Sequence, residues 1–254
     1  MTDLQAPAAR PASGLAELLD LAKTVLVALL IAGLLRTALF QPNTIPSDSM
    51  EPTLQTGDYL LISKWDYGWS RHSIPFAPPL FEGRVFERAP RRGDVVVFKL
   101  PRDPAQLYVK RILGLPGDQL RVEGGVLFIN GRPVTRADLG LTRDPGEPDL
   151  TVERVRETLP GGRSYITFER GPGHEGDDTG TYVVPRGHYF GIGDNRDNSL
   201  DSRWPEAVGV GFIPAENLVG RARLSLASWR KGASILKPWT WLDVAPERFF
   251  RPVR

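Results

Sequence analysis

Two serines lie close together in a short segment between two prolines. Residues 45–54 read Ile-Pro-Ser-Asp-Ser-Met-Glu-Pro-Thr-Leu, so that Ser47 and Ser49 flank Asp48. A serine hydroxyl becomes a useful nucleophile when a neighbouring base takes its proton. Taken alone, the segment is better explained as an ordinary Ser/Pro surface loop, and a catalytic interpretation depends on whether a base exists elsewhere.

A candidate base lies in the segment 108–113, which reads Tyr-Val-Lys-Arg-Ile-Leu and alternates as a strand does. Lys110 faces the opposite side from Val109 and Arg111. If Lys110 points inward, burial disfavours its charged form and lowers its pKa from about 10.4, so that it can serve as a general base. The alternative is a lysine whose stem lies on the surface with its ammonium in water.

A third polar segment, residues 193–203, follows an apolar stretch and reads Gly-Asp-Asn-Arg-Asp-Asn-Ser-Leu-Asp-Ser-Arg. Its density of charged and amide groups predicts a fixed hydrogen-bonded cluster. A metal site made of the acids is conceivable, but Arg196 and Arg203 alternate with them, and internal ion pairs explain that pattern better. The histidines offer a weaker alternative base, because His72, His174 and His188 lie in no matching motif.

The elements that must position these residues are expected to be β-strands. Asn130-Gly131, between two short apolar runs, predicts a hairpin with a type I′ turn. The 26 Gly and 23 Pro also favour short strands joined by turns. We therefore predict a mainly β fold, with antiparallel sheets forming a catalytic core and an inserted smaller β lobe. The expected strands are residues 58–63, 94–100, 108–113, 126–129, 132–134, 189–193 and 218–226.

Composition excludes several classes of function. The 254 residues hold 32 Lys and Arg against 30 Asp and Glu, a net charge of +2 that argues against a nucleic-acid partner. The absence of cysteine excludes disulfides, a cysteine nucleophile and cysteine-ligated metals.

A membrane segment is expected at residues 18–40. Residues 24–35 form an uncharged run of 12 residues. If the segment is extended past Lys23 and Arg36, its length reaches the roughly 20 residues that a helix needs to cross a bilayer. A buried core helix and a cleaved signal peptide are the alternatives, but no small-residue cleavage site follows the run. We favour an uncleaved single-pass anchor. The basic residues before the run place the N-terminus in the cytoplasm.

Two segments after the anchor have a distinctive composition. The Glu175, Asp177 and Asp178 cluster could bind Ca²⁺, although a solvated turn explains it better. The C-terminal residues hold six Lys and Arg and three Trp, which favours contact with a membrane surface as much as packing on the body. The expected regions of the chain are a cytoplasmic tail (1–17), the anchor (18–40), a catalytic β core (41–135 and 182–228), an inserted polar lobe (136–181) and a basic aromatic tail (229–254).

Taken together, the motifs identify a family. The chain resembles the type I signal peptidases, or leader peptidases, which are membrane-bound serine endopeptidases with a Ser/Lys dyad. The order of the motifs along the chain matches that of the family. The resemblance includes the anchor and residues 40–42, 46–54, 93–98, 108–118, 193–203 and 212–222.

The resemblance implies roles for individual residues. Ser49 corresponds to the nucleophile and Lys110 to its general base. The Ser47 side chain and the backbone N–H of Ser49 correspond to the oxyanion hole. Ser199 corresponds to the residue that orients the lysine, while Asp201 and Arg203 correspond to a supporting ion pair. The family chemistry requires neither a metal nor another cofactor.

The implied substrates are exported preproteins cut after a small-x-small motif, bound as an added strand beside residues 46–49 and 108–110. Asn43, in place of a larger apolar residue, is expected to alter the second specificity pocket. Asp48 stands where the family commonly has glycine, and we expect its carboxylate to point to solvent. The residues implied to line the first pocket are Ile45, Met50, Leu54, Tyr108 and Val109, and those of the second are Leu60 and Val96.

The resemblance places the catalytic domain on the outer side of the cytoplasmic membrane. Its implied partners are preproteins, the lipid bilayer and, as a candidate, the protein-export machinery. Two alternatives remain open: a self-cleaving Ser/Lys protein of the repressor type and a catalytically inactive, membrane-tethered binding module. The anchor argues against the first, and the presence of both Ser49 and Lys110 argues against the second.

Overall fold

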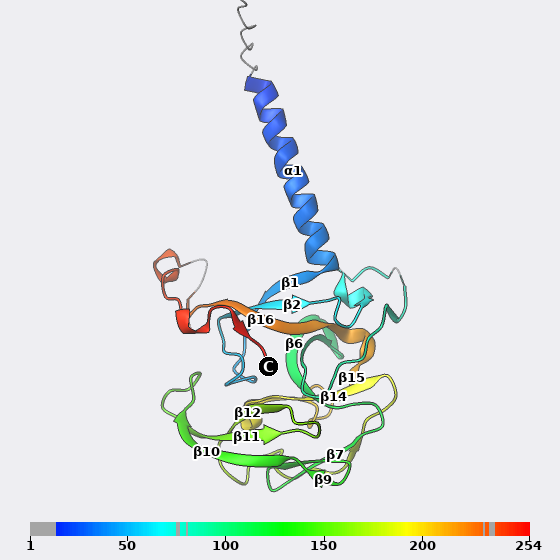
Figure 1. Ribbon diagram of the computed structural model, residues 1–254, viewed down its shortest axis with the longest axis vertical. Helices are drawn as coiled ribbons and strands as arrows, with labels where there is room; N and C mark the ends of the chain where they lie inside the picture. Colours follow the sequence, from blue (N-terminus) through cyan, green and yellow to red (C-terminus); the bar gives the residue numbers. More distant parts are fainter. Residues whose placement is uncertain (1–13, 75–76, 80, 231, 234–236) are drawn as a thin grey trace, which may run out of the picture.

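A computed structural model describes residues 14–74, 77–79, 81–230, 232–233 and 237–254. Its first element, helix α1 (Gly14–Ala38), stands away from the rest of the molecule (Figure 1). Residues 14–36 are long and apolar enough to cross a membrane, and no part of this apolar stretch is buried against the protein. This exposure is incompatible with the buried core helix that the sequence left open.

The bounds of α1 differ from the expected segment 18–40. The helix starts earlier, and Phe40 already begins strand β1 (Phe40–Thr44). Pro42 explains the early end, because proline cannot continue a helix and disfavours helical geometry in the residue before it. The foot of the helix is tied to the body by the Trp69 indole N–H, which donates to the Ala38 carbonyl at 2.8 Å.

An antiparallel sheet of eight strands forms the catalytic core, in the order β1-β2-β16-β5-β6-β14-β15, with β17 also paired to β16. Apolar side chains of β2, β5 and β16 are buried in two clusters, which explains the Val- and Leu-rich segments that predicted these strands. The further bounds are β2 (Asp58–Ser63), β5 (Val95–Leu100), β6 (Asp103–Gly114), β14 (His188–Ile192), β15 (Ile213–Pro214), β16 (Leu218–Ser228) and β17 (Arg251–Pro252).

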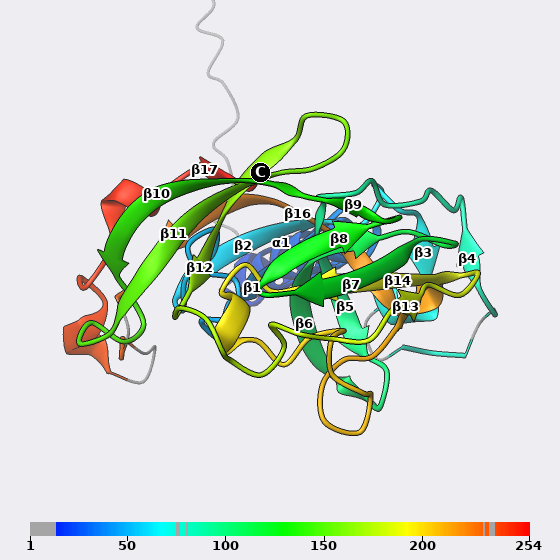
Figure 2. The same ribbon diagram turned by 90° about the horizontal axis from the view of Figure 1, so that it is seen from below.

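Two smaller sheets lie on the side of the core away from α1 (Figures 1 and 2). One has the order β13-β7-β8-β9 and contains the predicted hairpin, in which Asn130 and Gly131 both have positive φ, as a type I′ turn requires. The other has the order β10-β11-β12. Their bounds are β7 (Gln119–Glu123), β8 (Val126–Ile129), β9 (Arg132–Pro133), β10 (Thr135–Arg143), β11 (Thr151–Thr158), β12 (Ser164–Glu169) and β13 (Tyr182–Val183).

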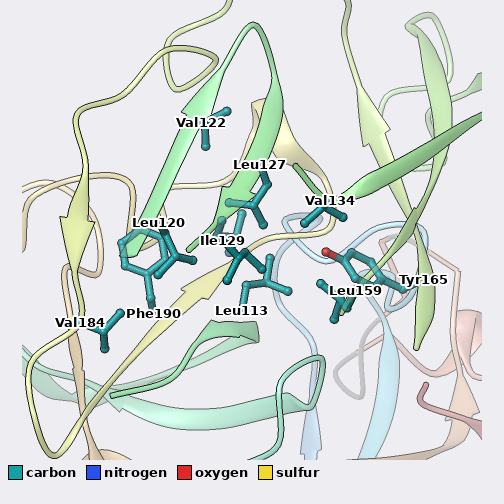
Figure 3. Packing of buried hydrophobic residues seen from close by; sticks show 11 residues of the cluster. Leu113, Leu120, Val122, Leu127, Ile129, Val134, Leu159, Tyr165, Val184 and Phe190 are labelled. Carbon is teal, nitrogen blue, oxygen red and sulfur yellow. The ribbon is translucent and has the colours of Figure 1, made fainter. Parts of the chain in front are cut away.

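The inserted lobe, residues 136–181, contains most of β10 and all of β11 and β12, so that it is a β lobe, as the fold prediction stated. It does not pack alone, because one apolar cluster joins Tyr165 of the lobe to Leu120 and Ile129 of the hairpin sheet and to Phe190 of the core (Figure 3). Residues 119–134 thus pack against both the lobe and the main sheet.

Short elements complete the chain. Strands β3 (Trp69–Ser70) and β4 (Arg84–Val85) pair with each other in the stretch between β2 and β5. The C-terminal tail both packs and protrudes: the buried Arg248 guanidinium pairs with Asp58, whereas Trp239 and Leu242 are exposed. The 3₁₀ turns are η1 (Arg71–Ser73), η2 (Arg196–Asn198), η3 (Ala215–Asn217), η4 (Pro238–Thr240) and η5 (Pro246–Arg248).

Candidate active site

The serine loop, residues 45–54, follows β1 directly. Its apolar side chains Ile45, Met50 and Leu54 are buried in one core cluster with Leu60 and Val97. Burial of these anchors leaves Ser47 exposed and Ser49 half-buried. The alternation of apolar and polar residues in this segment therefore fixes the loop and presents its hydroxyls, which an ordinary surface loop would not do.

Lys110 lies on β6 and reaches the serine loop. Its Nζ lies 2.6 Å from Ser49 Oγ, and the residue is 2 % exposed. Space for the lysine stem comes from Gly191 of the adjacent β14, where a Cβ would lie 2.9 Å from Lys110 Cβ. The structure thus brings together the two residues that the sequence predicted as nucleophile and base.

The electrostatic surroundings favour a neutral Lys110. Burial is the largest cause and lowers the pKa of Lys110 to about 8; Asp201 and Asp194 oppose this shift, whereas Arg203 adds to it. Both carboxylates are already engaged by arginines, Asp201 by Arg203 and Asp194 by Arg111. The amine can therefore accept a proton from Ser49 near neutral pH.

Ser47 lies on the open side of the dyad, with its Oγ 3.4 Å from Ser49 Oγ. It is exposed, so that its hydroxyl can reach a ligand in the cleft. The position is compatible with the predicted donor to an oxyanion.

Ser199 lies in the support loop, residues 193–203, and lines the same cleft as Ser49 and Lys110. It is 7 % exposed, and its Oγ has no hydrogen-bond partner among the described residues. The structure thus shows no hydrogen bond from Ser199 to Lys110, and the predicted orienting role stays a prediction. Gly193 allows Ser199 to approach, since a Cβ there would lie 2.3 Å from Ser199 Oγ.

The expected ion pair between Asp201 and Arg203 is present and buried. Arg203 Nε donates to Asp201 Oδ1 at 2.9 Å, and Arg203 Nη2 donates to Asp201 Oδ2 at 3.0 Å. The backbone N–H of Gly193 also donates to Asp201 at 2.9 Å. Burial would raise the pKa of Asp201, but Arg203 and these hydrogen bonds hold it below its usual value. The pair closes the support loop on itself.

A second buried ion pair was not predicted. Arg111 donates to both oxygens of Asp194, at 2.8 and 2.6 Å, and Thr53 Oγ1 donates to Asp194 Oδ2 at 2.5 Å. The Asn195 N–H donates to the Ser49 carbonyl at 3.1 Å. This network joins β6, the support loop and the serine loop. Both residues of the Arg111–Asp194 pair lie in motifs that the sequence analysis singled out, 108–118 and 193–203. The spacing of the residues did not show which arginine pairs with which acid.

The cleft beside the dyad holds about 910 Å³. Four of the predicted substrate-binding residues line it, whereas Leu54, Leu60 and Val96 are fully buried and do not. The reason is the pleat of the sheet: Leu60 packs beneath Ile45 and Met50, and Val96 packs with Tyr108. These three residues support the floor of the cleft. The four that line it are Ile45, Met50, Tyr108 and Val109.

Three other acids have defined local roles. We expected the Asp48 carboxylate to point to solvent. Instead, it accepts a hydrogen bond from Thr56 Oγ1. Asp177 accepts hydrogen bonds from the backbone N–H groups of Gly173 and His174, and Asp178 accepts one from Gly124. The last two carboxylates therefore cap turns, and the described residues contain no group of three potential metal ligands.

Comparisons with known proteins identify the family of this chain. The family model described as "Signal peptidase, peptidase S26" matches residues 18–229. The signal peptidase I of Rickettsia typhi is 38 % identical over 228 residues, covering 82 % of this chain and 84 % of that protein. That of Rickettsia massiliae is 36 % identical over 240 residues, covering 87 % and 88 %. A solved signal peptidase I from Enterococcus faecalis is 24 % identical, with a TM-score of 0.30, and covers 53 % of this chain and 97 % of its own.

The fold and the site define a serine endopeptidase with an N-terminal apolar helix that fits a membrane anchor. The chain belongs to the signal peptidase I family, peptidase S26, whose members remove signal peptides. The alternatives of a repressor-type self-cleaving protein and an inactive binding module are not favoured.

Proposed function

We propose that Ser49 is the nucleophile and Lys110 the general base that cut exported preproteins after a small-x-small motif. The observation that supports this most directly is the 2.6 Å separation of Lys110 Nζ and Ser49 Oγ in a partly buried site. Neutral Lys110 accepts the Ser49 proton as Ser49 Oγ attacks the scissile carbonyl carbon. Lys110 then returns that proton to the leaving amine. A water molecule, activated by Lys110, hydrolyses the acyl-enzyme.

The tetrahedral intermediate places negative charge on the former carbonyl oxygen. The Ser47 hydroxyl and the Ser49 backbone N–H are the donors proposed to stabilise it. Ser199 would keep the Lys110 amine directed at Ser49, and the Asp201–Arg203 pair would hold the loop that contains Ser199.

The substrate would bind as an extended strand between residues 46–49 and 108–110. Ile45, Met50, Tyr108 and Val109 would contact its small residues, while buried Leu54, Leu60 and Val96 keep these contacts shallow. Asn43 pairs with Leu60 in the sheet, at the edge where the second pocket is proposed.

The proposed location is the cytoplasmic membrane, with the N-terminus inside and the catalytic domain on the outer side. The segment 237–243 lies at the end of the domain from which α1 projects (Figure 1). Its exposed Trp239, Trp241 and Leu242 support contact with the lipid surface. Brominated lipid should quench less fluorescence in Trp239→Phe/Trp241→Phe than in wild type, whereas the cleft variant Trp204→Phe should leave lipid quenching unchanged.

The experiment that tests the dyad is cleavage of a preprotein with an Ala-x-Ala site by the solubilised full chain. Wild type should cut it, and Ser49→Ala and Lys110→Ala should not. Ser164→Ala and Lys99→Ala, which replace the same residue types outside the cleft, should retain activity. Cleavage by Lys110→Ala would show that the base lies elsewhere, and no cleavage by folded wild type would contradict the proposed function.

A further inference from the structure

One turn of the inserted lobe reaches the catalytic cleft. His174 and Glu175, far from the dyad in sequence, line the same cavity as Ser49 and Lys110. Both residues are exposed, so that a bound peptide can contact them. The turn, residues 173–177, lies outside every motif on which the family resemblance was based.

The position of this turn is fixed from both sides. The buried Asp177 carboxylate accepts hydrogen bonds from the Gly173 and His174 N–H groups at 2.9 and 2.8 Å, and the Asp177 carbonyl accepts one from Gly125 at 3.0 Å. Gly176 has φ +94°, and a Cβ there would lie 3.1 Å from Arg203 Nη1. The turn therefore packs on the arginine that closes the support loop, and Glu175 projects from a defined position.

The walls of the cleft identify the part of the substrate that meets this turn. One wall is the serine loop, and a second is residues 106–110 of β6. Under the proposed binding mode, these two walls contact the residues before the scissile bond. The third wall consists of residues 196–200, Trp204 and the 173–177 turn. Neither recognition segment belongs to this wall. Under the proposed binding mode, it is therefore left for the segment after the scissile bond.

The third wall is electronegative. Arg196 would offset its acids, but its guanidinium is bound to buried Glu157. Asp197 uses one oxygen to accept the Arg170 N–H at 2.7 Å, while its Oδ1 has no partner among the described residues. Glu175 makes no ion pair within the part of the chain that the structure describes. Glu175 is thus the exposed carboxylate of this wall, Asp197 adds a second negative charge, and neither makes an ion pair among the described residues.

We propose that the 173–177 turn forms the leaving-group side of the cleft, where Glu175 selects by charge among the first residues of the mature protein. Basic residues just after the cut are favoured, and acidic residues are disfavoured. This inference rests on the proposed function of Ser49 and Lys110, and it assigns the inserted lobe a direct role in substrate choice.

The test uses two peptides with the same Ala-x-Ala site, carrying either Lys or Glu at both the second and the third position after the cut. Because side chains alternate along an extended chain, one of the two faces the wall. For wild type at low salt, kcat/KM should be about three- to tenfold higher for the Lys peptide, as expected for partly exposed charge pairs. The difference should lie mainly in KM and shrink in about 0.5 M salt.

The variants separate this inference from the proposed function. Glu175→Gln should reduce the Lys/Glu preference, and Glu175→Lys should reverse it. Glu153→Lys, an equally exposed position on β11 outside the cleft, should match wild type. A preference that is absent in wild type, or unchanged in Glu175→Lys, would overturn the inference while leaving the dyad intact. Failure of wild type to cut either peptide would overturn the proposed function, and this inference with it.

Discussion

The guanidinium of Arg196, in the support loop, makes a two-point ion pair with the Glu157 carboxylate of the inserted lobe. Arg196 Nη1 donates to Glu157 Oε1 at 2.8 Å, and Nη2 donates to Oε2. Arg196 is 5 % exposed and Glu157 is 0 % exposed. The Tyr165 hydroxyl also donates to Glu157, and the Tyr165 ring lies 4.2 Å from the Arg111 guanidinium. The lobe is thus connected to the neighbour of Lys110.

Backbone contacts extend this connection. The Phe168 N–H donates to the Asp194 carbonyl at 2.9 Å, and the Arg170 N–H donates to the Asp197 carboxylate at 2.7 Å. The end of β12 therefore holds the start of the support loop, whose other end is closed by the Asp201–Arg203 pair. We interpret the lobe as the element that keeps this loop, and with it Ser199, in place.

Removing one partner of the Glu157–Arg196 pair should destabilise the protein strongly. Glu157→Gln leaves the Arg196 charge buried without a counter-ion, a change that typically costs about 3–5 kcal/mol. Urea unfolding of the full chain in detergent measures the difference. Glu153→Gln, exposed on the same strand, should change the free energy of unfolding by less than about 0.5 kcal/mol. Equal stability of the two variants would show that the ion pair does not hold the loop.

The local part of the site could be predicted from sequence. Ser49 and Lys110 each lie in a short segment whose apolar residues determine which side chains are buried, and the Asn130-Gly131 turn depends on two adjacent residues. Such signals are confined to a few neighbouring positions. The strand segments 58–63 and 94–100 were predictable for the same reason, and both lie in the main sheet.

Pairs made across long sequence separations could not be predicted in this way. No local pattern assigns Glu157 to Arg196 or Asp194 to Arg111, since each arginine had several acids available. The direction of Leu60 and Val96 was equally undetermined, because the sheet is covered on both faces and either direction meets a core cluster. The bend that brings the 173–177 turn to the cleft likewise depends on packing against Arg203.

Activity should rise with pH through the range around pH 8. The pKa of Lys110 is lowered to about 8 by burial, and only the neutral amine can take the Ser49 proton. The rate constant kcat should therefore be low at pH 6 and approach a plateau above pH 9. Lys110→Arg should be inactive throughout, because guanidinium stays protonated. A wild-type rate that is independent of pH from 6 to 10 would exclude a lysine base.

Loss of one oxyanion donor should slow the reaction without preventing binding. Ser47→Ala removes the hydroxyl 3.4 Å from Ser49 Oγ and should lower kcat by about 10²–10³ while KM changes little. Ser47→Thr keeps a hydroxyl and should retain more activity than the alanine variant. Equal loss in both variants would assign the effect to loop packing instead.

Replacing the buried lysine should stabilise the fold while abolishing activity. The pKa of Lys110 is lowered in the folded state, so that unfolding takes up a proton between about pH 8 and 10.5. The unfavourable contribution of Lys110 to stability therefore shrinks as pH rises across that window. Lys110→Met should be more stable than wild type by roughly 1–3 kcal/mol at pH 7. Its advantage should shrink from pH 8 to 10. Denaturant unfolding at both pH values measures it, and a constant difference would contradict the lowered pKa.

Glu51 should make the protein sensitive to alkali. It is 1 % exposed, and burial, followed by the hydrogen bond and charge of Asp144, raises its pKa to about 9. The folded state therefore keeps a proton that the unfolded chain releases near pH 4.5. Stability from this group is fully present at low pH and is lost as pH rises toward 9. The melting temperature of wild type should fall from pH 6 to 9 by more than that of Glu51→Gln.

The amide of Glu51→Gln can still donate to Asp144, so the variant should match wild type near pH 5 and exceed it at pH 9. Because Glu51 is in the serine loop, the same substitution should extend the alkaline plateau of activity, where wild type loses structure while Lys110 is already neutral. Glu153→Gln, an exposed carboxyl, serves as the matched control and should follow the wild-type profile. Parallel profiles of Glu51→Gln and wild type would mean that Glu51 is already ionised in the folded protein. The nearby Asp144 would then not keep Glu51 protonated.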